Sequence, residues 1–193
     1  MRKHTQTDTE KLKEAELVTR ARQQDAEAFA ELYASVYRDL YRFALYTLGN
    51  PEDAEDVVSD TVTDAYAAIH KLRSVEAFRP WIFRILTNKC RMILKSYVNR
   101  TLPLEIDIQT PDRNYAEIQD VRNAFARLDE QERLILSLTI FAGYSNEESA
   151  RLLHMKSGTL RSIKSRSLDK LETLLHYERS VSCLLYTSDA ADE

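Results

Sequence analysis

The sequence predicts an all-α fold of two small helical domains joined by a flexible linker. Glycine and proline are scarce, with three glycines and four prolines in 193 residues, whereas the two together make up roughly 12% of an average protein. β-Sandwiches, Rossmann domains and P-loop enzymes need many turn glycines, so the composition argues against them. Apolar residues recur at helical spacing along most of the chain. Residues 101–114 lack this period, hold two of the four prolines and form the predicted linker.

The first domain is expected to span residues 11–100, after a disordered N-terminus at 1–10. Its apolar spacing predicts a helix beginning at Lys11 and three more at about 26–48, 51–72 and 80–98. Gly49 is suited to end the second helix in a left-handed conformation. Asn50 and Pro51 are suited to cap and open the third helix.

The second domain is expected to span residues 115–178, followed by a disordered tail at 179–193. Its predicted helices cover about 116–128, 129–142, 145–153 and 157–176. Asp129 with Glu132, and Ser145 with Glu148, form the capping-box pattern of a helix N-terminus. A short helix, a four-residue turn at 154–157 and a longer helix together form the helix-turn-helix pattern.

Charge is unevenly distributed along the chain, although the net charge is only −4. Residues 71–100 hold eight basic residues and one acid, and residues 151–170 hold six basic residues and one acid. Residues 51–66 hold six acids and no base. Because an ordinary solvated face mixes both signs, the two acid-poor blocks favour binding to phosphates, and the acidic helix favours a basic partner.

Helical wheels divide both basic helices into two faces. In the fourth helix the apolar residues share one side, and the other side carries Arg84, Asn88, Arg91 and Lys95. Arg and Lys suit phosphate contacts and Asn suits a base edge. The last helix presents Arg161, Ser162, Ser165 and Arg166 near its N-terminus, where a major-groove helix contacts bases. Lys164 falls inside the apolar arc, so either its amine extends out of the arc or the true arc is slightly rotated from the one assigned.

The sequence contains no pattern typical of an enzyme. GxSxG, HExxH, Walker and CxxC motifs are absent, and the four histidines lack ligand spacing. We therefore expect no catalysis, no cofactor, no metal and no small-molecule substrate. The polar N-terminus is no signal peptide, and the most apolar stretch, 134–144, is too short to span a bilayer. Two cysteines make no disulfide framework, so we expect a soluble, cytoplasmic protein.

Four segments, taken in order, carry a resemblance to one family. They are LVTRARQQDAEAFAELY at 17–33, DAEDVVSDTV at 53–62, AFRPWIFRILTN at 77–88, and the span 128–162 that holds the helix-turn-helix. This order resembles bacterial RNA polymerase sigma factors of the sigma-70 family, extracytoplasmic-function (ECF) group. The second segment is similar to their polymerase-binding region 2.2, the third to their segment that melts and reads the −10 element, and the fourth to region 4.

The resemblance implies a dissociable subunit that binds core RNA polymerase and directs transcription initiation at −10/−35 promoters. The first domain would dock on the clamp of the largest subunit and the second on the flap of the other large subunit. An anti-sigma factor is a further partner that the resemblance suggests. The implied polymerase-facing residues are Asp53, Asp56, Val57, Val58 and Asp60. Those implied for −10 DNA are Leu72, Arg84, Asn88, Lys89, Arg91 and Lys95. Those implied for the −35 element are Thr159, Arg161, Ser162, Ser165 and Arg166.

Some positions depart from the pattern of the family. Leu72 stands where an aromatic residue is frequent, Ser149 where a core Ile is usual, and His154 where a turn Gly is usual. The residues from Cys183 to the end resemble translated adapter DNA, a sequencing artefact, and the alternative is a genuine C-terminus. A two-domain helical regulator that binds duplex DNA without docking on polymerase is the alternative function. The acidic helix separates the two functions, because a free-standing DNA-binding protein does not need it.

Overall fold

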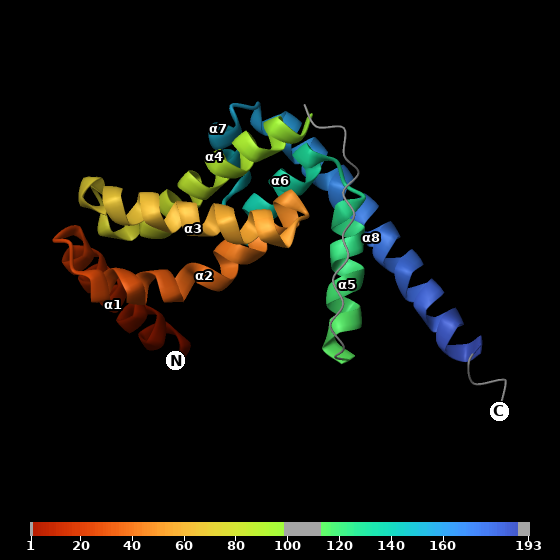
Figure 1. The fold of residues 1–193 in the computed structure, drawn as a ribbon, viewed down its shortest axis with the longest axis horizontal. Coiled ribbons are helices and arrows are strands. Elements are labelled where there is room, and N and C mark those ends of the chain that lie inside the picture. The colour runs from red at the N-terminus through yellow and green to blue at the C-terminus, as the bar shows by residue number, and fades with distance from the viewer. Residues whose placement is uncertain (1, 99–112, 189–193) are drawn as a thin grey trace. The chain divides into compact units, whose positions relative to one another are not determined.

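The computed structural model describes residues 2–98 and 113–188. Every regular element in these two ranges is a helix, as Figure 1 shows. The chain divides into two compact units, Met1–Leu102 and Pro103–Glu193, and the division lies inside the predicted linker. The predicted linker up to residue 112 and the end of the predicted tail, 189–193, lie outside the described residues.

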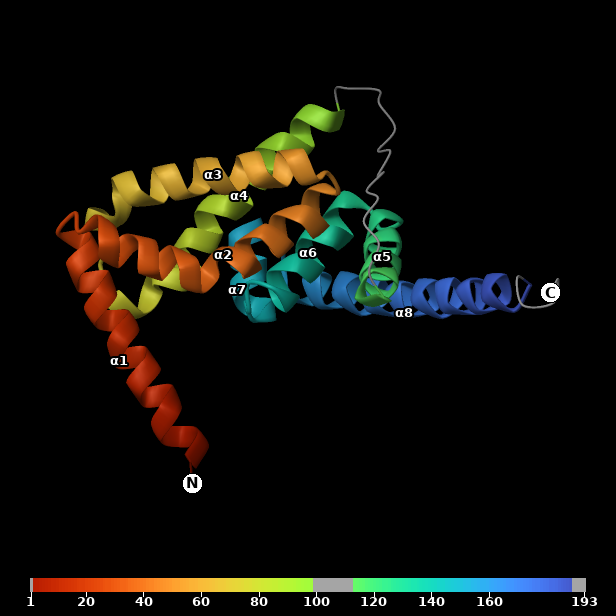
Figure 2. The ribbon, with the colours of Figure 1, turned by 60° about the horizontal axis from the view of Figure 1, so that its bottom comes forward.

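The first unit is built around its second helix. Its elements are α1 (Arg2–Arg22), α2 (Ala26–Leu48), α3 (Pro51–Ala68), the 3-10 turns η1 (Ile69–Lys71) and η2 (Val75–Ala77), and α4 (Phe78–Val98). Helix α2 packs against α1, α3 and α4, and α3 also packs against α4 (Figure 2). The predicted caps are present: Asn50 Oδ1 accepts from the Asp53 N–H at 3.1 Å, and Gly49 has a φ of 77°. These caps explain why α2 and α3 meet in a two-residue connection.

Aromatic and aliphatic side chains fill the core of this unit. Phe43 of α2 meets Phe83 of α4 edge-to-face, with ring centroids 5.8 Å apart, and Phe29 meets Tyr66 of α3 in the same way at 5.1 Å. Such aromatic pairs contribute about 0.5–1.5 kcal/mol beyond the apolar area that they bury. The rings therefore fix α3 and α4 on α2.

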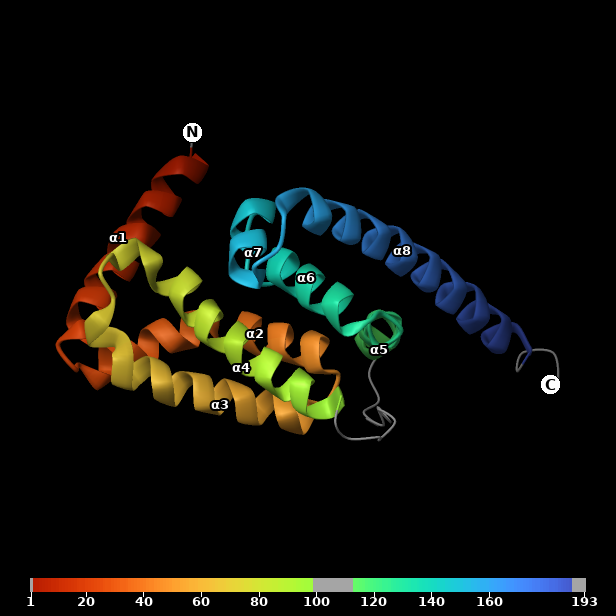
Figure 3. The same ribbon diagram turned by 90° about the horizontal axis from the view of Figure 1, so that it is seen from above.

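The second unit contains four helices: α5 (Arg113–Ala126), α6 (Glu130–Ile140), α7 (Asn146–Leu153) and α8 (Ser157–Ser188). Helix α8 packs against each of the other three (Figure 3). Both predicted capping boxes are formed, with Asp129 and Glu132 bonded reciprocally, and likewise Ser145 and Glu148. The bonds from Ser145 lower the pKa of the Glu148 carboxyl, because the backbone N–H and the hydroxyl favour its charged form.

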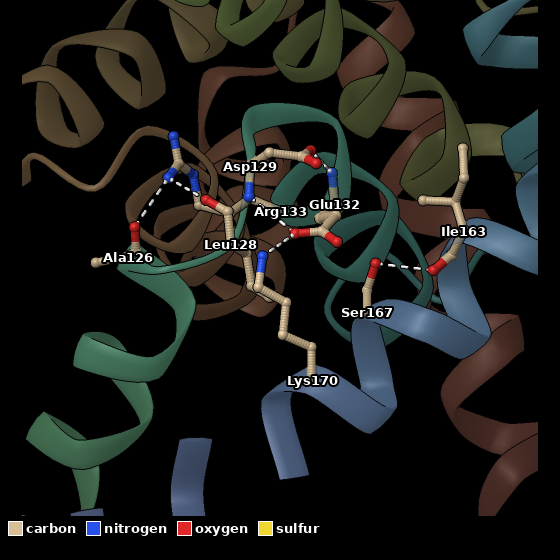
Figure 4. A network of polar contacts seen from close by, with 8 residues as sticks. All are labelled: Ala126, Leu128, Asp129, Glu132, Arg133, Ile163, Ser167 and Lys170. Carbon is tan, nitrogen blue, oxygen red and sulfur yellow. Dashed lines mark hydrogen bonds and ion pairs between the residues drawn. The ribbon is translucent and has the colours of Figure 1, made fainter. Parts of the chain in front are cut away.

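In the second unit, a polar network joins the end of α5, the start of α6 and α8 (Figure 4). The buried Arg133 guanidinium donates to the Leu128 carbonyl at 2.9 Å, and so satisfies a backbone acceptor in the α5–α6 connection. Glu132 completes its capping box and also accepts from Lys170 of α8 at 2.9 Å. The start of α6 is thereby held to both neighbouring segments.

Several helix boundaries differ from the sequence-based expectation. Helix α3 ends at Ala68, although its predicted range extended to about residue 72. Helix α1 begins at Arg2, although 1–10 were expected to be disordered, and α8 continues to Ser188, although it was expected to end near residue 176. Neither added stretch contains Gly or Pro, so nothing in the sequence ends the helix there. Helix α4 begins at Phe78, two residues before Pro80, which stands in the first turn where proline is tolerated.

His154 should destabilise the turn of the second unit. It ends α7 with a φ of 56°, in the left-handed region where a Cβ is strained. We expect His154→Gly to raise the free energy of unfolding of this unit by about 0.5–1 kcal/mol, the left-handed strain less the backbone entropy of glycine. Amide hydrogen exchange in α7 and α8 of the full chain measures the change.

Gly143 provides the matched control for this prediction. It has a φ of +72°, and a Cβ added there would meet no atom within 4 Å. Gly143→Ala therefore introduces backbone strain without a clash. It should speed amide hydrogen exchange in the same unit. If both variants changed protection in the same direction, left-handed strain would not be the cause.

Candidate polymerase and nucleic-acid interfaces

The acidic surface lies on helix α3. Asp56 and Asp60 are exposed, and Asp53 is half-buried near the N-terminus of the helix. Acids in the first turn are favourable beside the positive end of the helix dipole. Asp56 and Asp60 lie beyond that turn, one helical turn apart, so they share one face and can meet basic groups of a partner.

Val57 and Val58 lie on the opposite side of α3, and the structure corrects their assignment to the polymerase-facing set. Each is only 2% exposed, and both are part of the core of the first unit. Together with Ala54, Thr61 and Ala65 they form the buried stripe of the helix. The helical period of this stripe is visible in the sequence, but the family segment was carried over as a block.

Helix α4 presents the predicted basic face. Arg84, Asn88 and Lys95 are exposed and Arg91 is half-buried. The opposite side is more deeply buried than the wheel predicted, because Phe83 and Thr87 join Ile82, Leu86 and Cys90 in the core. Burial raises the pKa of the Cys90 thiol. The exposed face thus offers cations and one amide on a rigid helix.

The first turn of α4 is fixed to α2 by Arg79. Its guanidinium lies 2.7 Å from Asp39 and 5.1 Å from the centre of the Phe83 ring. An ion pair and a cation–π contact on the same side chain restrict its rotamers. Arg79 therefore helps to orient α4, and was not predicted as a site residue.

The side chain of Leu72 is buried in this structure. Leu72 follows η1 and is 5% exposed, so it belongs to the core. A residue that captures a flipped-out base must present its side chain at the surface. The structure therefore contradicts the placement of Leu72 among the −10 contacts.

Lys89 faces α3 rather than the rest of the basic face. Its ammonium nitrogen lies 2.7 Å from a carboxylate oxygen of Asp64 and 3.9 Å from one of Asp60. Its predicted contact with −10 DNA is thus in competition with two carboxylates. Asp64 was missed by sequence reasoning, although its spacing of four from Asp60 places both on one helix face.

The helix-turn-helix consists of α7, the turn and the start of α8. Ile135, Ala150 and Leu160 form its core, with Leu153, Met155 and Ile163 packed against them. Ser149 is fully buried, at the position where an isoleucine was expected, and its hydroxyl has no hydrogen-bond partner among the described residues. Lys164 is half-buried and its amine donates to Asn146 Oδ1 at 3.4 Å, so it reaches out of the apolar arc, the first of the two alternatives. The turn is therefore held by a small apolar core.

The predicted −35 residues all lie on the outer face of α8. They are exposed, near the N-terminus of the helix: Thr159, Arg161, Ser162, Ser165 and Arg166. The Ser162 hydroxyl donates to the Gly158 carbonyl at 3.1 Å, and Arg166 Nε donates to the Ser162 carbonyl at 3.3 Å. Arg161 is exposed in the first two turns of α8, and the five N–H donors of its guanidinium can meet a base edge or a phosphate.

Two kinds of feature do not occur in the described parts of the chain. Residues 2–98 and 113–188 hold no group of three or more His, Cys, Asp and Glu side chains that could bind a metal ion. In the same ranges no helix combines the length and the apolar character needed to cross a bilayer. The features that remain are the charged faces of α3, α4 and α8.

Fold and surfaces together define a two-domain helical protein with an acidic helix, a basic helix and a helix-turn-helix. The family models for sigma-70 region 2 and sigma-70 region 4 match residues 32–100 and 118–171. ECF RNA polymerase sigma factor SigM of Mycobacterium tuberculosis is 30% identical over 168 residues, which cover 85% of each chain. RNA polymerase sigma factor NccH of Alcaligenes xylosoxydans xylosoxydans is 33% identical and covers 82% of this chain and 92% of its own. The chain belongs to the ECF sigma factors of the sigma-70 family.

Solved structures show the same fold. CnrH in complex with the cytosolic domain of CnrY is 25% identical with a TM-score of 0.64, and covers 86% of this chain and 98% of its own. Sigma factor RpoE in complex with the anti-sigma factor NepR from Bartonella quintana is 24% identical with a TM-score of 0.66, and covers 78% and 98%.

Proposed function

We propose that the protein is a dissociable promoter-specificity subunit, which binds core RNA polymerase and directs initiation at −10/−35 promoters without catalysis of its own. The observation that carries the proposal is the division of opposite charges among three helices. An acidic face on α3 and a basic face on α4 share one unit, and a helix-turn-helix with an exposed basic edge forms the other. A free-standing DNA-binding protein has no use for the acidic face.

Each surface has a proposed partner. The exposed carboxylates of Asp56 and Asp60, with Asp53 beside them, bind basic side chains of the polymerase clamp. Arg84, Arg91 and Lys95 hold phosphates of the −10 strand and Asn88 contacts a base. Thr159, Arg161, Ser162, Ser165 and Arg166 contact the −35 element. An anti-sigma factor is a further proposed partner, supported by the complexes in which CnrH and RpoE were solved.

Co-elution with core polymerase tests the proposal directly. The full chain is mixed with core enzyme, passed over a size-exclusion column, and the polymerase fractions are assayed on a −10/−35 promoter. We expect the chain in the polymerase peak and transcription that depends on it. A chain that elutes alone but binds duplex DNA tightly and specifically would instead be the free-standing regulator.

Substitutions of two residues on the exposed face of α4 should impair promoter binding in different ways. The amide of Asn88 suits a base edge, whereas we assign the ammonium group of Lys95 to a phosphate. We expect Asn88→Ala to change the preference among −10 sequences, and Lys95→Ala to weaken binding to all of them alike. Holoenzyme affinity for a panel of −10 variants, measured at several salt concentrations, separates the two effects. Identical profiles for the two variants would refute the assignment of Asn88 to base contact.

A further inference from the structure

Lys89 stands apart from the other cations of helix α4. At 3.6 residues per turn, Arg84, Asn88, Arg91 and Lys95 fall within about 60° of arc, and Lys89 lies about 130° from the centre of that stripe. Its side chain is only 24% exposed and reaches α3. The direction of the side chain thus separates Lys89 from the basic face with which the sequence grouped it.

The partners of Lys89 belong to the acidic surface. Asp60 is 76% exposed and Asp64 is 59% exposed, so both carboxylates remain accessible to a second molecule. One turn of α3 separates them, and the Lys89 ammonium group approaches both from α4. A basic side chain that binds Asp60 or Asp64 from outside must therefore compete with an ammonium group already in place.

We infer that Lys89 belongs to the polymerase-facing surface, where its ammonium group competes with basic side chains of core polymerase for the carboxylates of Asp60 and Asp64. The inference rests on the proposed function, because it assumes that this face of α3 docks on polymerase. Lys89 then acts as a positioning residue: it holds the two carboxylates and lowers their net charge. It limits the affinity of docking rather than contacting DNA.

The size of the effect follows from the exposure of the pair. Ion pairs with exposed partners are weak, so removing Lys89 should tighten binding to core polymerase only about two- to fivefold. Binding should also become more sensitive to salt, because the carboxylates lose their internal counter-charge. A purely structural role for Lys89 predicts weaker binding, not tighter.

The test measures the affinity of the full chain for core polymerase at several salt concentrations. Lys89→Gln should bind about two- to fivefold more tightly, and Lys89→Arg, which keeps the pair, should bind as the wild type does. Lys13→Gln is the matched control, because it makes the same charge change and breaks another surface pair, with Glu31 at 2.6 Å. It should leave the affinity unchanged. Thermal unfolding checks that each variant is folded. If Lys89→Gln is unstable, Lys89→Met replaces it, because methionine keeps the apolar part of the lysine side chain.

A double-mutant cycle links the effect to Asp64. Asp64→Asn should weaken polymerase binding more in the Lys89→Gln chain than in the wild type, because Lys89 no longer occupies the carboxylate. Promoter selectivity of the Lys89→Gln holoenzyme at −10 should equal that of the wild type. An affinity no higher than that of Lys13→Gln, or a loss of −10 DNA binding, would overturn the inference. Charge reversal at Asp56 and Asp60 tests the docking face independently, so a failure of the proposed function is recognised separately.

Discussion

Asp56→Arg combined with Asp60→Arg should abolish the binding of core polymerase and leave the fold intact. Both side chains are exposed on α3, and neither contributes to the core. Like charges brought together at an interface cost several kcal/mol, so we expect the affinity to fall by roughly a hundredfold or more. Lys89 keeps Asp64 as its partner at 2.7 Å, so the contact between α3 and α4 survives the change. Size-exclusion binding with purified core enzyme measures the loss.

Glu14→Arg combined with Glu16→Arg provides the control for net charge. Both residues lie on α1, and the double variant makes the same change in charge away from α3. It should bind core polymerase as the wild type does, and the circular dichroism of both variants should match the wild-type spectrum. Holoenzyme assembly by the Asp56 and Asp60 variant at wild-type affinity would show that polymerase docks elsewhere.

The sequence specified the helices where local signals were strong. The range predicted for α2 agrees with the structure at both ends, because an Asp at the N-cap and a glycine at the C-cap satisfy the terminal backbone groups locally. The start of α7 was equally clear from its capping box. Helix ends without such signals were misplaced, as at α1 and α8, where no residue forces the helix to stop.

The site was predicted less completely than the fold, for two physical reasons. A family segment was carried over as a block, so Val57 and Val58 were assigned to the surface although their helical period places them in the buried stripe of α3. Ion pairs between helices depend on tertiary contacts, so the pairing of Lys89 with Asp64 could not be read from residues 25 positions apart. Charges on one exposed helix face, such as Arg84 and Lys95, were predicted correctly as exposed because only local periodicity decides them.

Arg161→Ala and Arg166→Ala should relax the preference for the −35 sequence and leave promoter opening unaffected. Both residues lie on the outer face of α8, in the unit that does not contain α4. A bidentate contact between Arg and guanine is worth about 1–3 kcal/mol of discrimination. Each variant should therefore lose roughly ten- to a hundredfold in its preference for the correct −35 element over a mismatched one.

Paired templates separate −35 recognition from melting. One template is fully duplex, and the other carries an artificial bubble at −10, so that opening no longer limits transcription. Because the bubble supplies the melted strand that α4 is proposed to bind, the Arg161 variant should lose activity on the duplex template and keep most of it on the bubble. Lys156→Ala is a suitable control, since it removes one exposed cation from the turn before α8 without touching the outer face. Equal losses by the Arg161 variant on both templates would mean that α8 also acts during opening, and that the two units do not divide the promoter as proposed.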